Sequence, residues 1–472
     1  MTNGSSDRIH AELAAWVAAA PAGTRLPSSR TLSARHGASP VTVQKVLHRL
    51  AAAGLVESRP GVGTFVRRRA PRGPVDLGWQ SAALGAPHVR YPRASPTQRS
   101  ADPDAVALHS GYPVSDLLPA AAVRAALARA ARSEASVRRA PAAGLLELRA
   151  WFAADLAGDG GFGTAASPVS ARDVLVLPGS QSGLSAIFRA IVGRDRPLVV
   201  ESPTYWGAVV AAAQAGVELV PVPSGPHGPD PEEVASAMDR TGARAFYAQP
   251  TWSNPHGARW SDDRARAVLD VVRARSAFLV EDDWAHDFGI DAQARPLARM
   301  DDGGHVIHLR SLTKSLSPAV RVGAVIARGP ARDRIEADLA AGTMYVSGVL
   351  QAAALDVVTQ PAWRTHLRAL GPRLRARRDG LLAALRTHLP EAAVDHVPTG
   401  GLSLWVRLPE GTDLEKLTRA AAARRVLIAP GDEWFPAEPS GPHIRLTYSG
   451  PEPERYPSAV AAIAEALREQ RG

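Results

Sequence analysis

The sequence predicts two structural units in tandem: a small α+β unit over residues 1–70 and a large α/β domain over residues 107–472, joined by a linker over residues 71–106. Three observations predict this division. The first 75 residues hold eleven basic and three acidic side chains, a net charge of +8, whereas the remaining 44 basic and 43 acidic side chains give only +1. Two short helix patterns and a hairpin pattern follow one another before residue 67. Farther along, short apolar runs alternate with helical stretches.

The composition limits the class of protein. Hydrophobic residues make up 45% of the 472 residues and charged residues 21%, which excludes a largely disordered chain. No run approaches the roughly 18 apolar residues of a membrane span, and no basic segment precedes the apolar stretch near Trp16 as in a signal peptide. We therefore expect a cytoplasmic protein. The absence of cysteine excludes disulfides, thiolate metal sites and cysteine nucleophiles, and no metal site is expected.

The first elements of the small unit are helices. Residues 7–20 have helical spacing of apolar side chains, with Asp7 placed to cap the helix. A second, short helix is expected to begin at Ser28 or Ser29 and to end at Gly37. Its residues Leu32 and Ala34 are expected to face inward.

A third helix and a hairpin complete this unit. The helix is expected to begin at Ser39 and end at Gly54, because apolar side chains recur in it at helical spacing. Residues 55–59 and 64–66 are predicted strands, and residues 60–63, with the sequence Pro-Gly-Val-Gly, form the turn between them. Two short helices joined by a tight turn and followed by a hairpin predict a winged helix-turn-helix. Together with the excess of basic residues, this fold points to an anionic polymer as partner.

The motifs of residues 23–66 resemble the winged helix-turn-helix of the GntR family of bacterial regulators. They read G-T-R-L-P-S-S-R-T-L, S-P-V-T-V-Q-K-V-L-H-R-L and G-L-V-E-S-R-P-G-V-G-T-F-V. The resemblance implies binding to double-stranded DNA through residues of the second helix, the third helix and the wing, namely Ser28, Ser29, Arg30, Thr42, Gln44, Lys45, Arg59, Gly61 and Gly63. The family usually has arginine where Pro40 stands, so one DNA contact of the family is missing here. The alternative is that these helices form only a packing unit.

The linker is rich in proline and glycine and has little periodicity, as in an extended connector. Trp79 and Tyr91 are candidates for docking it locally. The arginines at positions 67–69 could add phosphate contacts next to the wing.

The large domain contains a series of short apolar runs separated mostly by helical stretches. This alternation predicts an α/β domain with a mostly parallel sheet, in which functional side chains collect at the carboxyl ends of the strands. The runs lie at residues 174–177, 197–200, 245–247, 277–280 and 305–309.

The scarcity of lysine singles out one residue after the last of these runs. Only Lys45, Lys314 and Lys416 occur among the 55 basic residues. Arginine stays protonated and does not form a Schiff base, whereas a desolvated lysine amine can. Lys416 stands beside Glu415 on a predicted helix and is interpreted as a surface residue. Lys314 is therefore a candidate for covalent chemistry.

Each strand-like run of the large domain is followed by polar or small residues. In order, they include the helix-opening Gly179–Gly183, then Tyr205, then the run 249–257, then Asp282, then Lys314. Small residues at a helix N-terminus offer free backbone N–H groups to a phosphate. This order closely resembles the fold-type I, pyridoxal-phosphate-dependent aminotransferase superfamily over roughly residues 107–465.

That resemblance implies a role for each residue. Lys314 holds the aldehyde of pyridoxal 5'-phosphate (PLP) as a Schiff base, Asp282 faces the ring nitrogen, Asn254 bonds the phenolic oxygen, and Tyr205 packs on the ring. The phosphate ligands are Ser180, Gln181, Ser311, Thr313 and Arg321. Arg445 clamps the α-carboxylate of an amino-acid-like effector.

The chain departs from the superfamily at two positions. Trp284 stands where a tyrosine is common, and the stretch 137–144 lacks the tyrosine that reaches the partner subunit's phosphate. Arg138 or Arg139 could supply charge instead. We interpret His286 as a structural residue.

The combination of the two units resembles the MocR subfamily of GntR-type regulators. It implies a homodimeric, PLP-dependent transcriptional regulator without net turnover, which senses an amino compound or PLP itself. In the expected mechanism, the effector displaces Lys314 and closes a small lobe, residues 107–150 and 355–472, so that DNA binding changes. Two alternatives stay open: a catalytically competent aminotransferase that carries a DNA-binding unit, and a regulator whose body has lost PLP.

Overall fold

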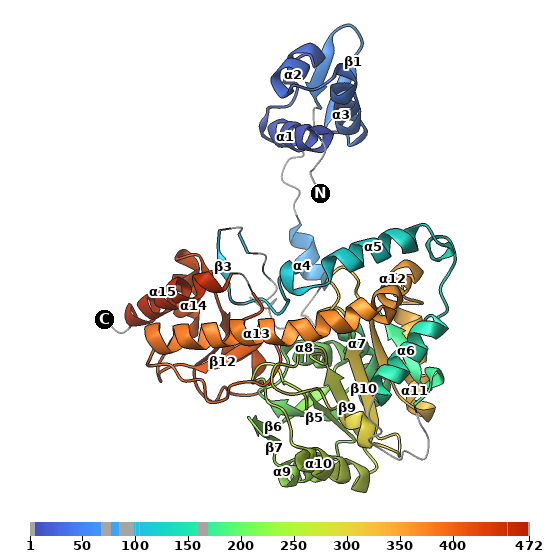
Figure 1. Cartoon of the computed structure of the whole chain (residues 1–472), viewed down its shortest axis with the longest axis vertical. Helices are drawn as coiled ribbons and strands as arrows, with labels where there is room; N and C mark the ends of the chain where they lie inside the picture. Colours follow the sequence, from blue (N-terminus) through green and yellow to red (C-terminus); the bar gives the residue numbers. More distant parts are fainter. Residues whose placement is uncertain are drawn as a thin grey trace. The chain divides into compact units, whose positions relative to one another are not determined.

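The computed structural model describes residues 5–67, 77–84, 99, 101–102, 104–158, 169–450 and 452–470. The chain divides into a small unit, Met1–Pro87, and a large unit, His88–Gly472 (Figure 1). The division falls within the predicted linker. Tyr91 and Arg68–Arg69 lie outside the described residues, whereas Trp79 is an exposed residue of helix α4 (Gly78–Leu84). No helix in the described ranges is long and apolar enough to cross a membrane.

The small unit is the predicted winged helix-turn-helix. Its elements are α1 (Ser5–Ala19), α2 (Ser29–His36), α3 (Pro40–Ala52) and an antiparallel hairpin of β1 (Val56–Arg59) and β2 (Gly63–Val66). All three helices and both strands contribute side chains to one core, which includes Ile9, Leu13, Leu32, Val43, Val46, Leu50, Val56 and Val66.

Capping side chains fix the ends of the two central helices. The Ser28 hydroxyl accepts a hydrogen bond from the Thr31 N–H, and the Ser39 hydroxyl accepts one from the Thr42 N–H. Gly37 ends α2 with a left-handed φ of 59°. These local signals explain why the sequence predicts the helices well.

One expectation for α2 is wrong. Leu32 is fully buried, but Ala34 is exposed. Two residues along a helix are separated by about 200° of rotation, so both cannot face the same core.

An eight-stranded sheet forms the centre of the large unit. Strand order across the sheet is β4-β11-β10-β9-β8-β5-β6-β7. The five strands from β10 to β6 are parallel, as predicted, whereas β11 is antiparallel to both of its neighbours and β7 is antiparallel to β6. In chain order the bounds are β4 Val174–Leu177, β5 Pro197–Ser202, β6 Glu218–Gly225, β7 Gly228–Pro229, β8 Ala245–Ala248, β9 Phe278–Asp283, β10 Val306–Ser311 and β11 Gly323–Ile326.

Helices cover this sheet and form the large lobe with it. They are α5 (Ala120–Ala131), α6 (Leu146–Ala157), α7 (Ser180–Ile187), α8 (Trp206–Ala215), α9 (Pro231–Thr241), α10 (Asp262–Ala274), α11 (Gly329–Gly342) and α12 (Gly348–Thr359). A π-helical segment, Phe188–Val192, continues α7.

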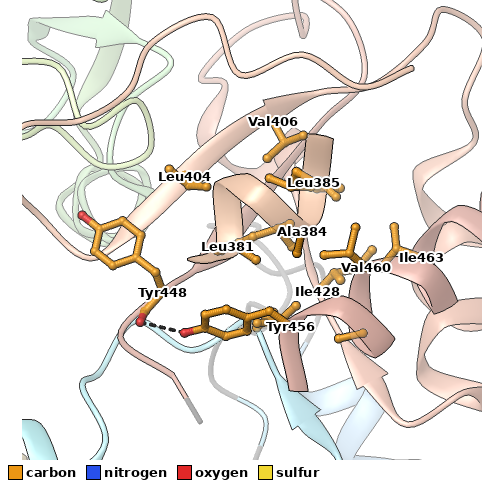
Figure 2. Close-up of a cluster of buried hydrophobic side chains, with 14 of the residues drawn as sticks. Leu381, Ala384, Leu385, Leu404, Val406, Ile428, Tyr448, Tyr456, Val460 and Ile463 are labelled. Carbon is orange, nitrogen blue, oxygen red and sulfur yellow. Dashed lines mark hydrogen bonds between the residues drawn. The ribbon is translucent and has the colours of Figure 1, made fainter. Parts of the chain in front are cut away.

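The small lobe has its own antiparallel sheet of β12 (Ser403–Arg407), β15 (His443–Thr447) and β14 (Ala429–Pro430). Helices α13 (Pro361–His388), α14 (Leu414–Ala423) and α15 (Tyr456–Arg468) pack on it. Figure 2 shows part of the core between them, where the buried Tyr456 hydroxyl donates to the Tyr448 carbonyl at 3.0 Å. A short strand, β3 (Val106–Ala107), pairs in parallel with β13 (Val426–Leu427) of this lobe.

The expected extent of the small lobe is wrong for part of residues 107–150. Helix α5 and the start of α6 pack in the same core as β4 and β11 of the large sheet, where Val123 and Leu148 join Val176 and Ala324. Only the segment around Leu108 and Leu117 joins the small-lobe core. Helix α13 serves both lobes, because Trp363 belongs to one core and its C-terminal half to the other.

Candidate functional site

The nine residues expected to hold PLP line one pocket of the large unit. They come from the ends of β9 and β10, from α7 and from the loops after β5, β8 and β10, because parallel strands end at the same edge of a sheet. The complete lining is Tyr112, Ser180, Gln181, Tyr205, Gln249, Asn254, Asp282, Trp284, Ser311, Thr313, Lys314 and Arg321. Their roles toward a cofactor stay predictions.

The carboxylate of Asp282 is held on one side only. Its Oδ2 accepts hydrogen bonds from the Tyr247 hydroxyl and the Gln249 side-chain amide, both at 2.8 Å. Its Oδ1 is buried and has no hydrogen-bond partner among the described residues. Burial raises the pKa of Asp282, and the bonds from Gln249 and Tyr247 oppose that rise. An unpartnered carboxylate oxygen at a pocket wall fits a ligand that presents an N–H group.

Lys314 lies in the turn that follows β10. Its Nζ is 4.1 Å from the centroid of the Trp284 ring and 6.0 Å from that of the Tyr205 ring. Burial, followed by the positive charge of Arg445, lowers the pKa of Lys314 to about 8. At pH 7 about a tenth of this amine is therefore unprotonated and nucleophilic, far more than for an ordinary lysine.

Hydrogen-bond donors gather at the part of the pocket where the phosphate is expected. Gly179 precedes α7 with a φ of 97°, and a Cβ built on it would lie only 2.7 Å from Nη2 of Arg321. Glycine therefore lets this guanidinium lie against the N-terminus of α7, whose first N–H groups lack helical partners. The buried Thr313 hydroxyl also lacks a hydrogen-bond partner within the described part of the chain.

Arg445 joins the two lobes at this site. It lies on β15 of the small lobe, and its guanidinium donates to the Asn254 side-chain oxygen at 3.1 Å and to the His109 carbonyl at 2.8 Å. Both acceptors are neutral, the Trp434 ring lies 4.9 Å from the guanidinium carbon, and burial lowers the pKa of Arg445 to about 10. The group is therefore a buried cation that is available to a carboxylate.

Sequence analysis missed a buried chain of polar groups behind Asp282. The Gln249 side chain also accepts a hydrogen bond from the Asn254 N–H at 2.8 Å, and the Gln249 N–H donates to Glu201 at 2.9 Å. Burial raises the pKa of Glu201. Gln249 begins the motif that contains Asn254, but its partners depend on the register of β5, β8 and β9. Tyr112, which also lines the pocket, has no motif that could have identified it.

The enclosed free volume of the pocket is about 50 Å³. That is less than an aromatic cofactor with a phosphate group requires, so its binding requires side chains to move. Lys314 is well suited to this movement because its stem is long and flexible. The donors and the free Asp282 oxygen fit PLP in kind: an amine for its aldehyde, a carboxylate for its ring nitrogen, and N–H and O–H groups for its phosphate.

The departures from the superfamily pattern also have structural positions. Trp284 lines the pocket with its indole N–H buried and without a partner among the described residues. Arg138 pairs with Glu134 at 3.0 Å, and the Arg139 guanidinium lies over the Tyr345 ring at 5.5 Å. His286 lies outside the pocket and is hydrogen-bonded to Asp283, which agrees with its structural interpretation.

The residues expected to bind DNA lie on α2, α3 and the hairpin of the small unit. Arg30, Gln44 and Lys45 are exposed. The hydroxyls of Ser28 and Thr42 are already engaged within their helix starts, with Thr31 and Ser39 respectively. These two residues are therefore better suited to ordering the helix starts than to reading bases.

The hairpin residues have different tasks. The Arg59 guanidinium pairs with Glu57 and lies 4.9 Å from the Phe65 ring centroid. Gly61 takes a left-handed φ of 74° in the turn. A Cβ on Gly63 would lie 2.8 Å from Nε of Arg25, so glycine here allows a second arginine to approach the hairpin. Val41, which sequence analysis did not select, is 78% exposed in the first turn of α3.

The chain matches two protein families. Residues 104–463 match the aminotransferase class I and II family, and residues 5–66 match the gntR family of bacterial regulatory proteins. It is similar to the HTH-type transcriptional regulator YdfD of Bacillus subtilis, with 26% identity over 91% of this chain and 89% of that protein. It is also similar to a probable rhizopine catabolism regulatory protein, MocR, of Rhizobium meliloti, with 29% identity over 94% of this chain and 90% of that protein.

Similarity to enzymes covers the large unit. The 2-aminoadipate transaminase of Thermus thermophilus is 27% identical over 79% of this chain and 91% of its own length. The crystal structure of LysN, an α-aminoadipate aminotransferase of Thermus thermophilus complexed with N-(5'-phosphopyridoxyl)-L-leucine, matches with a TM-score of 0.71 and 26% identity. That match covers 79% of this chain and 95% of the enzyme chain.

Proposed function

Because this chain belongs to the aminotransferase class I and II family and carries a GntR-family domain ahead of it, we propose that it is a PLP-dependent transcriptional regulator. Its small unit binds operator DNA, and its large unit senses an amino compound or PLP. The regulators YdfD and MocR match almost the whole chain, whereas the transaminase matches the large unit alone. The single observation that carries the cofactor assignment is the free, buried Oδ1 of Asp282 in the pocket of Lys314.

When bound, PLP supplies an aldehyde that reacts with amines and a protonated ring that withdraws electrons. The side chains of the pocket would hold PLP and control the protonation of its ring nitrogen. Lys314 offers an amine with a pKa of about 8, and Asp282 keeps a proton on the ring nitrogen through its free oxygen. Tyr247 and Gln249 hold the other oxygen of Asp282 and so fix the plane of the carboxylate.

Arg445 is the group through which an effector carboxylate acts on the lobes. Its guanidinium is bonded to Asn254 of the large lobe and to the His109 carbonyl. A carboxylate forms a stronger, bidentate pair with a guanidinium than two neutral acceptors do. An amino-acid-like effector thereby replaces a lobe-to-lobe bond with its own contacts, and this differential interaction shifts the balance between open and closed lobes.

We propose a homodimer, which the surface beside the pocket supports. Val137, Leu146 and Met344 are 78%, 58% and 59% exposed, respectively, and the contact of Arg139 with Tyr345 brings their two segments together. A groove of about 680 Å³, lined in part by Gln181, Arg321 and Thr343, extends the cofactor pocket. Exposed apolar side chains gathered next to a site are typical of a subunit interface.

The test combines a spectrum with DNA binding. PLP is added to the purified protein and to Lys314→Ala, followed by borohydride reduction and peptide mapping. Both proteins are then used to select DNA from a random library. The proposal requires a visible absorption band, a reduced adduct on Lys314, and selection of a repeated half-site. An adduct without any selected DNA would leave only the large-unit assignment. Selected DNA without an adduct would favour a regulator that has lost PLP.

A working aminotransferase is the second candidate, favoured by the retention of both Lys314 and Asp282 in one pocket. Repeated release of a keto acid from an amino acid, at more than one equivalent per subunit and with a second keto acid present, would support it. Release of no more than one equivalent of keto acid per subunit would support a regulator that senses the amino compound.

A further inference from the structure

A second, larger cavity lies outside the cofactor pocket. It has a volume of about 900 Å³ and is bordered by the segment after β9, by the start of α13 and by the end of α6. No predicted site residue lines it. Its size suits an organic molecule of the size of an amino acid or larger.

One carboxylate that lines this cavity has an oxygen without a hydrogen-bond partner among the described residues. The Asp287 side chain is only 4% exposed; its Oδ1 accepts a hydrogen bond from Arg310 at 2.8 Å, and its Oδ2 has no partner within the described residues. The other carboxylates of the lining, those of Asp155, Asp262 and Asp291, also pair with arginines, but no oxygen of these three is buried without a partner among the described residues. A buried, unpartnered acceptor is costly, and a ligand N–H group satisfies it.

Three arginines also line the cavity, Arg266, Arg299 and Arg368. Arg266 pairs with Asp263, whose side chain is 93% exposed, so water screens the pair. Arg368 donates to the neutral Thr365 hydroxyl, and Arg299 donates to backbone carbonyls. These arginines favour an anionic group on the ligand.

Apolar side chains also line the cavity, namely Ile290, Met300, Leu367 and Pro372. We propose that this cavity is a second ligand site, which binds an amino acid with an apolar side chain: the ammonium group on Asp287, the neighbouring carboxylate on a lining arginine and the side chain against the apolar residues.

The same carboxylate is linked to the cofactor pocket. Arg310, which pairs with Asp287, also donates to the Ser311 carbonyl at 2.8 Å, and Ser311 lines the cofactor pocket. A ligand bound to Asp287 would therefore affect Arg310, and Arg310 is itself bonded to Ser311 of the cofactor pocket. The two sites are coupled through this arginine, and such coupling is reciprocal.

The test is a calorimetric titration of the full chain with phenylalanine after PLP loading and borohydride reduction, which closes the Lys314 site to amines. We expect phenylalanine to bind about tenfold or more tightly than 3-phenylpropanoate, which lacks the amine, and phenylalaninamide, which lacks the carboxylate. If no PLP is retained, the same titration is made on the untreated chain, so the inference does not depend on the proposed function. No binding of phenylalanine, or equal binding of all three compounds, would overturn it.

Three variants locate the ligand. Asp287→Asn removes the charge and keeps the volume, and we expect at least tenfold weaker binding. Ala294→Trp places a bulky side chain in the lining without replacing a charged residue and should weaken binding at least tenfold. Asp333→Asn, at an exposed carboxylate of α11 whose partner Arg332 does not line the cavity, is the control and should bind like the parent. Unchanged binding to Ala294→Trp would place the ligand elsewhere. Equal affinities of the PLP-free and reduced parent protein would refute the coupling.

Discussion

Replacement of Asp282 by asparagine tests the cofactor assignment most directly. The Oδ2 position has two donors at 2.8 Å, from Tyr247 and Gln249, so the amide oxygen of an asparagine takes that position. The amide NH₂ group then occupies the position of the free Oδ1 and points a donor, instead of an acceptor, at the ring nitrogen. The substitution keeps the shape of the pocket and reverses the polarity of one contact.

The expected loss follows from the burial of this carboxylate. Asp282 is 1% exposed, so its bond to a protonated ring nitrogen is a charge-assisted hydrogen bond away from water. Such bonds contribute about 1.5–3 kcal/mol, which corresponds to a roughly 10- to 150-fold weaker affinity for PLP. The ring nitrogen of PLP should also lose its proton more easily, because Asp282 is the one carboxylate among the described residues that line the pocket.

The assay is an equilibrium titration of PLP-free protein, followed by absorbance. Tyr247→Phe is the matched control: it removes one donor to Oδ2 and leaves Oδ1 in place, so its loss should be several-fold smaller. An Asp282→Asn protein with parental affinity and an unchanged absorption band, and with a thermal transition like the parent's, would refute the assignment of Asp282 to the ring nitrogen.

Three further predictions concern other residues. Because the pKa of Lys314 is lowered to about 8, the rate of PLP incorporation should rise about tenfold per pH unit below pH 8 and level off above it, as measured by stopped-flow absorbance; a rate that still rises from pH 9 to pH 10 would contradict this. Lys45→Ala should weaken binding to all DNA sequences and reduce the salt slope of binding by about one, as measured by fluorescence anisotropy at several salt concentrations; an unchanged slope removes Lys45 from the phosphate contacts. Leu32→Ala should destabilise the small unit by about 2–5 kcal/mol in urea titrations, whereas Ala34→Ser, at an exposed position of the same helix, should have little effect; equal effects would contradict the observed packing of α2.

The sequence predicted local features well, because their causes are local. Ser28, Ser39 and Gly37 cap the helices of the small unit through neighbours within a few residues, and each cap is readable from the chain. The convergence of the candidate site followed from one rule of parallel sheets, since each polar motif stands directly after an apolar strand.

Long-range features escaped prediction because the sequence contains no signal for their partners. The bonds from Tyr247 and Gln249 to Asp282 depend on the register between β8 and β9. Membership of α5 in the large lobe depends on contacts with β4, about fifty residues away in sequence. The cavity at Asp287 is bordered by α6, the segment after β9 and α13, which no motif connects. The roles assigned to the pocket residues stay predictions until a cofactor is measured.

The pairing of β3 with β13 determines which lobe of the large unit is connected directly to the linker. Strand β3, at Val106–Ala107, is the first described strand after the linker, and it pairs with β13, Val426–Leu427, rather than with the large sheet. The two units are thus tethered through the small lobe, the part of the body that also carries Arg445. A rotation of the small lobe would move β3 and therefore the end of the linker that is attached to it. In the proposed mechanism, a movement of the small lobe would reach the small unit through the chain itself, so the response to an effector should change when the linker is lengthened.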